Sequence, residues 1–192
     1  MKDHKFFEKY LGNDLGLLTN ELIDRYRLIQ QAKVFGVSEL RPDEAWMSSG
    51  SVSTMKWREY NVFQFHIEGI RNLYSGISEL MKEACAYYDI DFYKQKYMIQ
   101  GWFNINESKG GKLDWHDHAA PGEYAPLFHD ESKIVENVNK NDRMIISEMG
   151  HPHAQGDWSW DGPRITVAYD LIPFNIVKTF PKESEQHWIP LV

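Results

Sequence analysis

The period of the hydrophobic pattern changes about halfway along the chain, and this change limits the folds that the chain can adopt. In the first half, apolar residues recur at helical spacing within residues 19–36 and 65–91. In the second half, residues 97–106 and 164–173 alternate between apolar and polar side chains, and residues 142–148 also favour a strand. Helices followed by strands predict an α+β or mainly β protein, with a sheet or sandwich backed by helices.

The two expected helices differ in how clearly the sequence delimits them. Thr19 can cap the first helix and Gly36 follows its last turn. The second helix has a continuous apolar stripe, interrupted by Gly69 and Gly76, which weaken a helix. Residues 37–61, between them, are expected to be irregular or to form short extended segments.

Each long strand is expected to have one apolar and one polar face. In the strand at residues 164–173, one face carries Arg164, Thr166, Ala168 and Asp170. In the strand at residues 97–106, Gln100, Trp102 and Asn104 oppose Tyr97, Ile99, Phe103 and Ile105. We expect helices to cover the apolar face and the polar face to look into a cavity.

Length and composition indicate one globular domain over residues 1–192. Within it, residues 1–95 are expected to give largely helical support, residues 96–175 the β core with the site, and residues 176–192 a C-terminal extension. The net charge of −7, without a run of basic residues, argues against a nucleic-acid partner.

Three further features favour a cytoplasmic protein without a membrane partner. The single cysteine, Cys85, cannot form an internal disulfide, the N-terminus lacks the apolar core of a secretion signal, and no apolar run is long enough to span a membrane. The oligomeric state is left open by the sequence.

Two stretches with paired histidines form the candidate metal site. If "LDWHDH" is extended, Asp114, His116 and His118 point to one side and Asp117 to the other. Two imidazoles converging from one strand can bind iron(II), copper(II) or zinc. The second stretch, "GHPHAQ", repeats the spacing at His151 and His153. The alternative is that both stretches are solvated polar loops.

Arg164 follows His153 by eleven residues, through a turn at residues 161–162. A hairpin of this length is expected to place His153 and Arg164 on neighbouring antiparallel strands that face the same interior. An anion that chelates the metal at one end could then receive two hydrogen bonds from the guanidinium and a third from Thr166.

Residues 97–173 resemble the iron(II)- and 2-oxoglutarate-dependent oxygenases, above all small bacterial and phage-type members. The likeness rests on the Trp-x-Asn strand, "WHDH", "DRMIISEMGHPHAQ" and "PRITVAYDLIP", in which Arg164-x-Thr166 matches an Arg-x-Ser/Thr motif. It implies a double-stranded β-helix, that is, a jelly-roll or cupin-like fold with N-terminal helices packed on one sheet. A phage-encoded protein acting in a host cytoplasm is compatible with it.

The resemblance also implies a reaction and a set of site residues. A dioxygenase of this family uses Fe(II), O2 and 2-oxoglutarate to hydroxylate a substrate, here a small molecule or a peptide, and releases succinate and CO2. By analogy, His116, His118 and His153 bind the metal, with His151 as the distal alternative. The cosubstrate is then bound by Arg164, Thr166 and Asn104.

The chain departs from the family pattern in two places. His118 stands where most members have a carboxylate, so the third ligand is His118, or Asp114 or Asp117, or water. Only residues 119–141 remain for three barrel strands, which predicts very short strands or a mobile lid. The alternative function is a cupin-like module that binds a metal or an anion without turnover.

Overall fold

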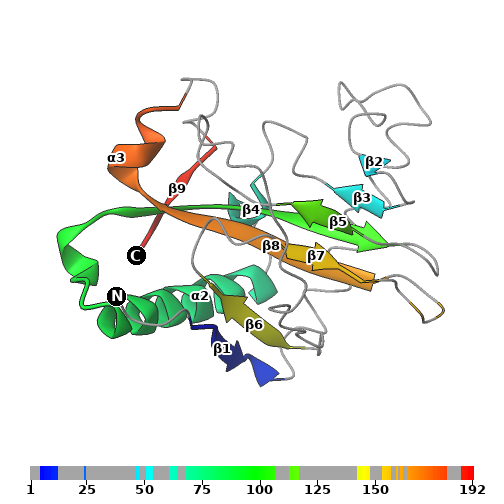
Figure 1. The fold of residues 1–192 in the computed structure, drawn as a ribbon, viewed down its shortest axis with the longest axis horizontal. Helices are drawn as coiled ribbons and strands as arrows, with labels where there is room; N and C mark the ends of the chain where they lie inside the picture. Colours follow the sequence, from blue (N-terminus) through cyan, green and yellow to red (C-terminus); the bar gives the residue numbers. More distant parts are fainter. Residues whose placement is uncertain are drawn as a thin grey trace.

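The protein is represented by a computed structural model (Figure 1). The described residues are 5–12, 24, 46–47, 51–53, 61–64, 68–106, 113–116, 142–147, 153–156, 159, 161, 164–180 and 187–192. The expected helix at residues 19–36 lies outside them, except for Asp24, which is helical. The predicted lid at residues 119–141 also lies outside them.

Two ten-residue strands form the centre of the main sheet. β4 (Tyr97–Asn106) pairs with β8 (Arg164–Pro173) in antiparallel fashion along the whole length of both. Their bounds agree with the sequence prediction. The register opposes Tyr97 to Pro173 at one end and Asn106 to Arg164 at the other. The faces predicted from the alternation are therefore aligned across the pair.

Short strands extend this sheet beyond β4. β9 (Ile189–Leu191) pairs with β4 near Tyr97, and β3 (Ser51–Ser53) pairs with its Asn106 end. β2 (Trp46–Met47) pairs in turn with β3. The short extended segments expected between the helices are thus present as β2 and β3.

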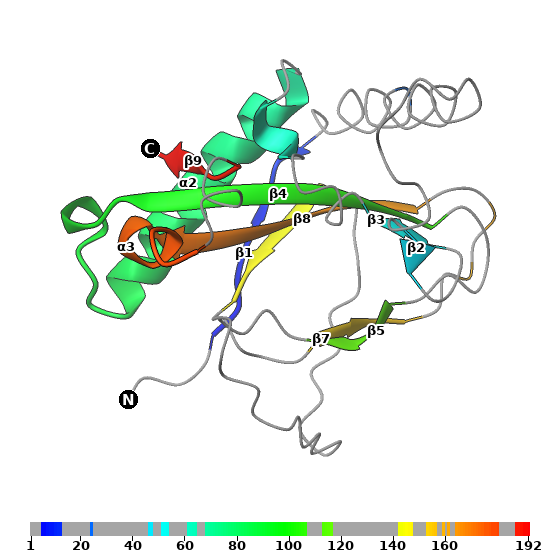
Figure 2. The same cartoon turned by 90° about the horizontal axis from the view of Figure 1, so that it is seen from above.

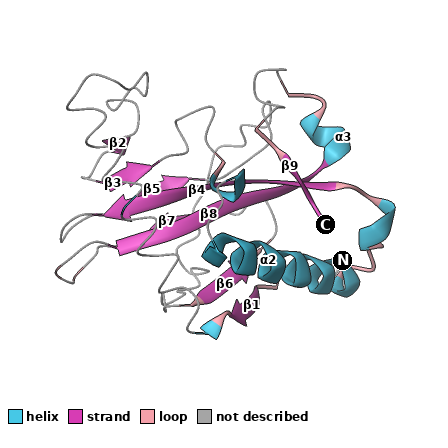
Figure 3. Ribbon diagram, turned by 180° about the vertical axis from the view of Figure 1, so that it is seen from behind, coloured by secondary structure: helices cyan, strands magenta, loops and turns pink. Residues whose placement is uncertain are grey.

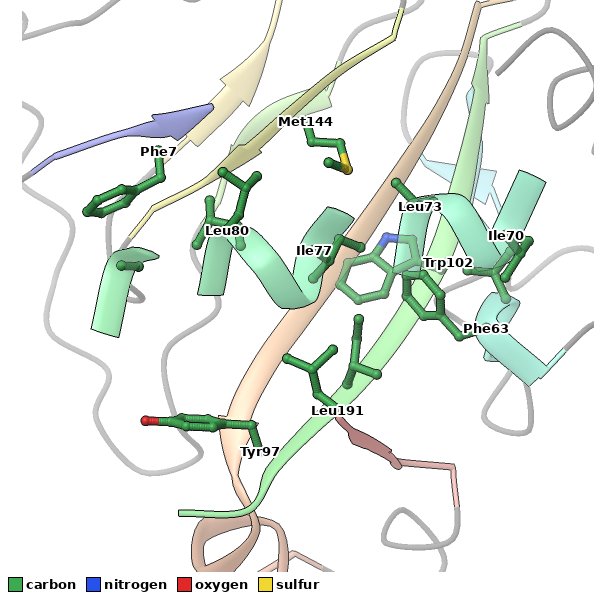
Figure 4. Packing of buried hydrophobic residues seen from close by; sticks show 14 of the residues in the cluster. Phe7, Phe63, Ile70, Leu73, Ile77, Leu80, Tyr97, Trp102, Met144 and Leu191 are labelled. Atoms are coloured by element: carbon green, nitrogen blue, oxygen red, sulfur yellow. The ribbon is translucent and has the colours of Figure 1, made fainter. Parts of the chain in front are cut away.

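Helix α2 (Glu68–Tyr87) covers the apolar face of the sheet and confirms the expected helix at residues 65–91 (Figures 1 and 3). Its predicted stripe is buried, and Figure 4 shows Ile70, Leu73, Ile77 and Leu80 within the core. The same core includes Tyr97, Ile99, Trp102 and Ile105 of β4, and Cys85 Sγ lies 3.5 Å from the Tyr97 hydroxyl. Cys85 is a core residue.

A two-stranded ladder packs beside α2. β1 (Phe7–Tyr10) pairs antiparallel with β6 (Arg143–Ile146), and β6 agrees with the strand predicted at residues 142–148. Gly76 lets the helix approach this ladder, since a Cβ there would lie 2.5 Å from Met144 Cε. The glycine that weakens the helix in the sequence therefore allows its packing. The Tyr169 hydroxyl donates to the Ile145 carbonyl at 2.9 Å and ties β6 to β8.

Asn61 joins three segments of the chain and was not singled out by the sequence. It precedes the 3-10 helix η4 (Val62–Gln64) and is 1% exposed. Its Nδ2 donates to the carbonyls of Ile99 and His187, at 3.1 and 2.7 Å. Its Oδ1 accepts from the backbone N–H groups of Phe63 and Gly101, at 3.1 and 3.2 Å. One amide thus fixes η4 and the C-terminal segment to β4.

The remaining described elements lie at the Tyr97–Pro173 end of the sheet. The 3-10 helix η5 (Phe92–Lys94) leads into β4, and its N-cap Asp91 accepts from the Tyr93 N–H. The short helix α3 (Phe174–Val177) follows β8, and Val177 packs with Met98 and Ile172. The structure is a mixed fold built on antiparallel strands with few helices, which confirms the coarse fold class. No helix among the described residues is long and apolar enough to span a membrane.

Gly101 provides a test of how closely η4 lies on β4. A Cβ at this position would lie 2.3 Å from Phe63 Cε2 and 3.0 Å from Val62 Cγ1. We expect Gly101→Ala to lower the free energy of unfolding by about 1–3 kcal/mol, because the Phe63 ring must leave its position. Urea denaturation followed by far-UV circular dichroism measures this loss.

Gly156→Ala is the matched control, because nothing lies within 4 Å of a Cβ built there. Its free energy of unfolding should stay within about 0.5 kcal/mol of the native value. Equal stability of Gly101→Ala and Gly156→Ala would show that η4 does not press on β4 in solution.

Candidate functional site

The two histidine stretches are brought together by a second, separate strand pair. β5 (Leu113–His116) and β7 (His153–Gln155) pair antiparallel, and the register opposes His116 to His153. Directly opposed residues of an antiparallel pair lie on one face, with Cβ atoms about 4.5–5.5 Å apart. The structure therefore brings together one histidine from each stretch, 37 positions apart in the sequence (153 − 116).

The pairing of β5 with β7 is irregular. Leu113 is opposed to Gln155 and His116 to His153, so three steps along β5 match two steps along β7. This is the geometry of a β-bulge, which interrupts the alternation of faces. The expectation that Asp114 and His116 share a face assumed regular alternation, which β5 does not have between Leu113 and His116.

The other predicted metal ligands are not placed by the structure. His118, Asp117 and His151 lie outside the described residues. Among the residues that are described, no three His, Cys, Asp or Glu side chains gather into a metal-binding group. His153, which is described, is exposed.

The predicted hairpin between His153 and Arg164 is wrong. β7 pairs with β5, whereas β8 pairs with β4, so His153 and Arg164 do not lie on neighbouring strands of one ladder. The prediction assumed that strands adjacent in the sequence pair with one another. β8 instead pairs with β4, which matches it over ten residues and aligns apolar with apolar positions.

The polar residues predicted for the two long strands meet at one end of the main sheet. Thr166 is opposed to Asn104, and Arg164 is opposed to Asn106. Asn104 is 9% exposed and Asn106 2%, while Arg164 and Thr166 are half-buried. Burial lowers the pKa of the Arg164 guanidinium, because its charge has lost part of its hydration.

Asn106 and Gln155 are polar residues of this region that the sequence analysis did not select. Asn106 continues the alternation of β4 two residues after Asn104, so the signal was present. Gln155 follows His153 by two residues on β7 and therefore shares its face. Both could have been found by continuing the alternation two residues further along each strand, from Asn104 to Asn106 and from His153 to Gln155.

Two amide side chains in this region each have a buried polar atom without a hydrogen-bond partner among the described residues. Within the described part of the chain, Asn104 Oδ1 has no donor and Gln155 Nε2 has no acceptor. Thr166 lies opposite Asn104, yet its hydroxyl does not bond this oxygen. Buried polar groups are rarely left in this state, and each needs an explanation.

The strand pair β5–β7 lies over the Arg164 end of the main sheet. In Figure 1, β7 overlaps the beginning of β8, and in Figure 2, turned by 90°, the two are separated. The pair is thus a second layer and not an extension of the main sheet, in agreement with the pairing. The histidine-bearing strands and the arginine-bearing end of β8 lie in the same part of the molecule.

Comparison of the chain with models of protein families, with curated proteins and with solved structures found no match. The function is therefore argued from the residues and their arrangement.

Proposed function

We propose that the protein is an Fe(II)- and 2-oxoglutarate-dependent dioxygenase that hydroxylates a small-molecule or peptide substrate and releases succinate and CO2. The observation that carries this proposal is the pairing of His116 with His153 in a layer over the Arg164 end of β8. Two histidines at opposed positions, in the layer over a half-buried arginine, suit a metal together with an anion that chelates it.

The order of strand pairing supports a double-stranded β-helix as the fold. β4 pairs with β8, and β5, which follows β4, pairs with β7, which precedes β8. Such nested pairing arises when one long hairpin is folded over on itself, as in a jelly roll. The two pairs belong to different sheets, as this fold requires. In the chain, β5 and β7 are separated by residues 117–152, which include β6.

The residues that would hold the metal fit its chemistry. His116 and His153 supply neutral nitrogen donors from opposed positions. We assign the third ligand to His118, with Asp114 and Asp117 as alternatives, and His151 as the alternative distal ligand. Iron(II) accepts both nitrogen and carboxylate oxygen, so either set is compatible with it. Three neutral ligands would leave the metal one charge more positive than the usual set.

The cosubstrate site is proposed at Arg164 and Thr166. The guanidinium offers two parallel N–H donors to a carboxylate, and the threonine hydroxyl, on the same face, offers a third. Partial burial strengthens these bonds, because less water competes for the charge. Asn104 was also predicted to bind this carboxylate, which only its Nδ2 donor could do, because the open Oδ1 atom is an acceptor.

Together, the metal and 2-oxoglutarate supply the activation of O2 that side chains cannot perform. The chain would hold both components in register: the imidazoles of β5 and β7 fix the metal, and Arg164 fixes the far end of the cosubstrate. Asn104 and Asn106 are buried, so bulk water does not reach these two side chains at this end of the main sheet.

Arg164→Lys tests the cosubstrate site. Lysine keeps the charge but loses the bidentate fork, so we expect the affinity for 2-oxoglutarate to fall about ten- to hundredfold, while iron binding is unchanged. Anaerobic isothermal titration calorimetry measures the affinity for iron(II) and then, with iron(II) present, the affinity for 2-oxoglutarate.

Lys178→Ala is the control, because this exposed cation lies over the Phe174 ring, beyond the opposite end of β8. Normal 2-oxoglutarate affinity in Arg164→Lys would remove the arginine from the site. Formation of succinate from 2-oxoglutarate, iron(II) and O2 separates the dioxygenase from the cupin-like binding module, which would bind without turnover.

A further inference from the structure

The two open amide atoms at the candidate site are complementary in their hydrogen bonding. Asn104 Oδ1 is an acceptor and Gln155 Nε2 is a donor, and the described residues satisfy neither. Asn104 lies on β4 at the Arg164 end of the main sheet, and Gln155 lies on β7 in the layer over that end. A group with one donor and one acceptor would satisfy both atoms.

We propose that Asn104 and Gln155 bind an amide group of the substrate, namely a carboxamide or a peptide bond. The N–H of this amide donates to Asn104 Oδ1, and its carbonyl oxygen accepts from Gln155 Nε2. The proposal rests on the proposed function, because it gives the substrate class of the same site. A carboxylate or an ester has no N–H and leaves Asn104 Oδ1 unsatisfied.

Turning an Asn or Gln amide by half a turn exchanges its donor with its acceptor. If both side chains are turned, an amide ligand that turns in the same way still matches the exchanged pair. Carboxylates and esters lack a donor and ammonium groups lack an acceptor, so each of them matches at most one of the two side chains.

The first experiment compares fragments that differ only in the N–H group. Primary carboxamides and the methyl esters of the same acids are titrated into the full-length protein, and binding is followed by ligand-observed NMR. We expect the carboxamides to bind about tenfold more tightly than their esters, the effect of one hydrogen bond. Asn104→Leu should remove this preference, and Asn104→Asp, which keeps the acceptor, should retain it.

Equal binding of amides and esters, binding of neither, or a preference that survives in Asn104→Leu would overturn the proposal. Gln155→Glu provides the second arm. It replaces the donor with an acceptor, so both carboxamides and esters should bind at least about tenfold more weakly. Unchanged binding in Gln155→Glu would also overturn it.

The second experiment needs no ligand. An amide retained to bind a substrate destabilises the free protein, so its replacement by an apolar side chain of similar volume should stabilise it. We expect Asn104→Leu and Gln155→Met each to raise Tm by about 2–5 °C. Asn61→Leu is the matched control, because the Asn61 amide has four partners and its loss should lower Tm.

A constant or lower Tm in Asn104→Leu would show that this amide serves the fold, and the proposal would then fail. These outcomes are distinct from failure of the proposed function. Binding of carboxamides by a protein that forms no succinate would leave the amide site standing and reject the dioxygenase. Succinate formation without amide preference would do the reverse.

Discussion

Replacing His153 with alanine is expected to lower the affinity for iron(II) by about hundredfold or more, since it removes a proposed ligand that no other side chain of β7 can replace. His116→Ala should have the same effect, because the register places the two residues opposite each other. Anaerobic calorimetric titration of iron(II) into each variant measures the loss, with a stoichiometry of about one iron per chain in the native protein.

Three further variants make this result specific. His4→Ala removes an imidazole that belongs to neither of the two histidine stretches, and it should leave iron binding intact. His151→Ala should also retain iron binding. If iron binding were lost in His151→Ala but not in His153→Ala, the distal ligand would be His151. His118→Ala should weaken binding less if an aspartate is the third ligand, and His118→Asp should then restore it. Native affinity in both His116→Ala and His153→Ala would reject the metal site.

The elements of this fold were predictable wherever the pattern is long and regular. The alternation over residues 97–106 and 164–173 gave β4 and β8 with correct bounds, because each strand has one strongly apolar face. The helix at residues 65–91 was found for the same reason. β1 was missed, because Phe7–Tyr10 is too short for any period to emerge.

The partners of the strands were not predictable from local rules. The hairpin between His153 and Arg164 followed from loop length alone, whereas β7 and β8 each pair with a strand more distant in the sequence. Such choices depend on the match of whole strands and on the layers they form, which a local window does not contain. The candidate residues Asn104, Thr166 and Arg164 were nevertheless on the same face, since alternation alone fixes this.

Asn61 shows the other limit of sequence analysis, because its role depends on backbone groups of three distant segments. No sequence pattern around residue 61 predicts that its amide donates hydrogen bonds to β4 and to the segment before β9. Buried amides with complete hydrogen bonding are recognised only once the surrounding backbone is known.

Asn61→Leu is therefore expected to have the largest effect on stability among the variants considered, a loss of about 3–5 kcal/mol in the free energy of unfolding. Leucine has nearly the same volume, so the loss reports hydrogen bonds and not a cavity. The Ile99 and His187 carbonyls lose a donor, and the Phe63 and Gly101 N–H groups lose an acceptor, in a place that is 1% exposed to solvent. The free energy of unfolding of native proteins is only about 5–15 kcal/mol, so this loss is a large part of it.

Urea denaturation monitored by tryptophan fluorescence and by far-UV circular dichroism measures this change, and Asn175→Leu, an exposed asparagine on α3, is the control that should stay within about 0.5 kcal/mol. Because the four bonds join η4 and the C-terminal segment to β4, we also expect the amides of Phe63 and Gly101 to exchange with solvent faster in the variant. A loss below about 1 kcal/mol would mean that water or neighbouring groups replace the amide, and that η4 and the C-terminal segment are held to β4 chiefly by apolar packing.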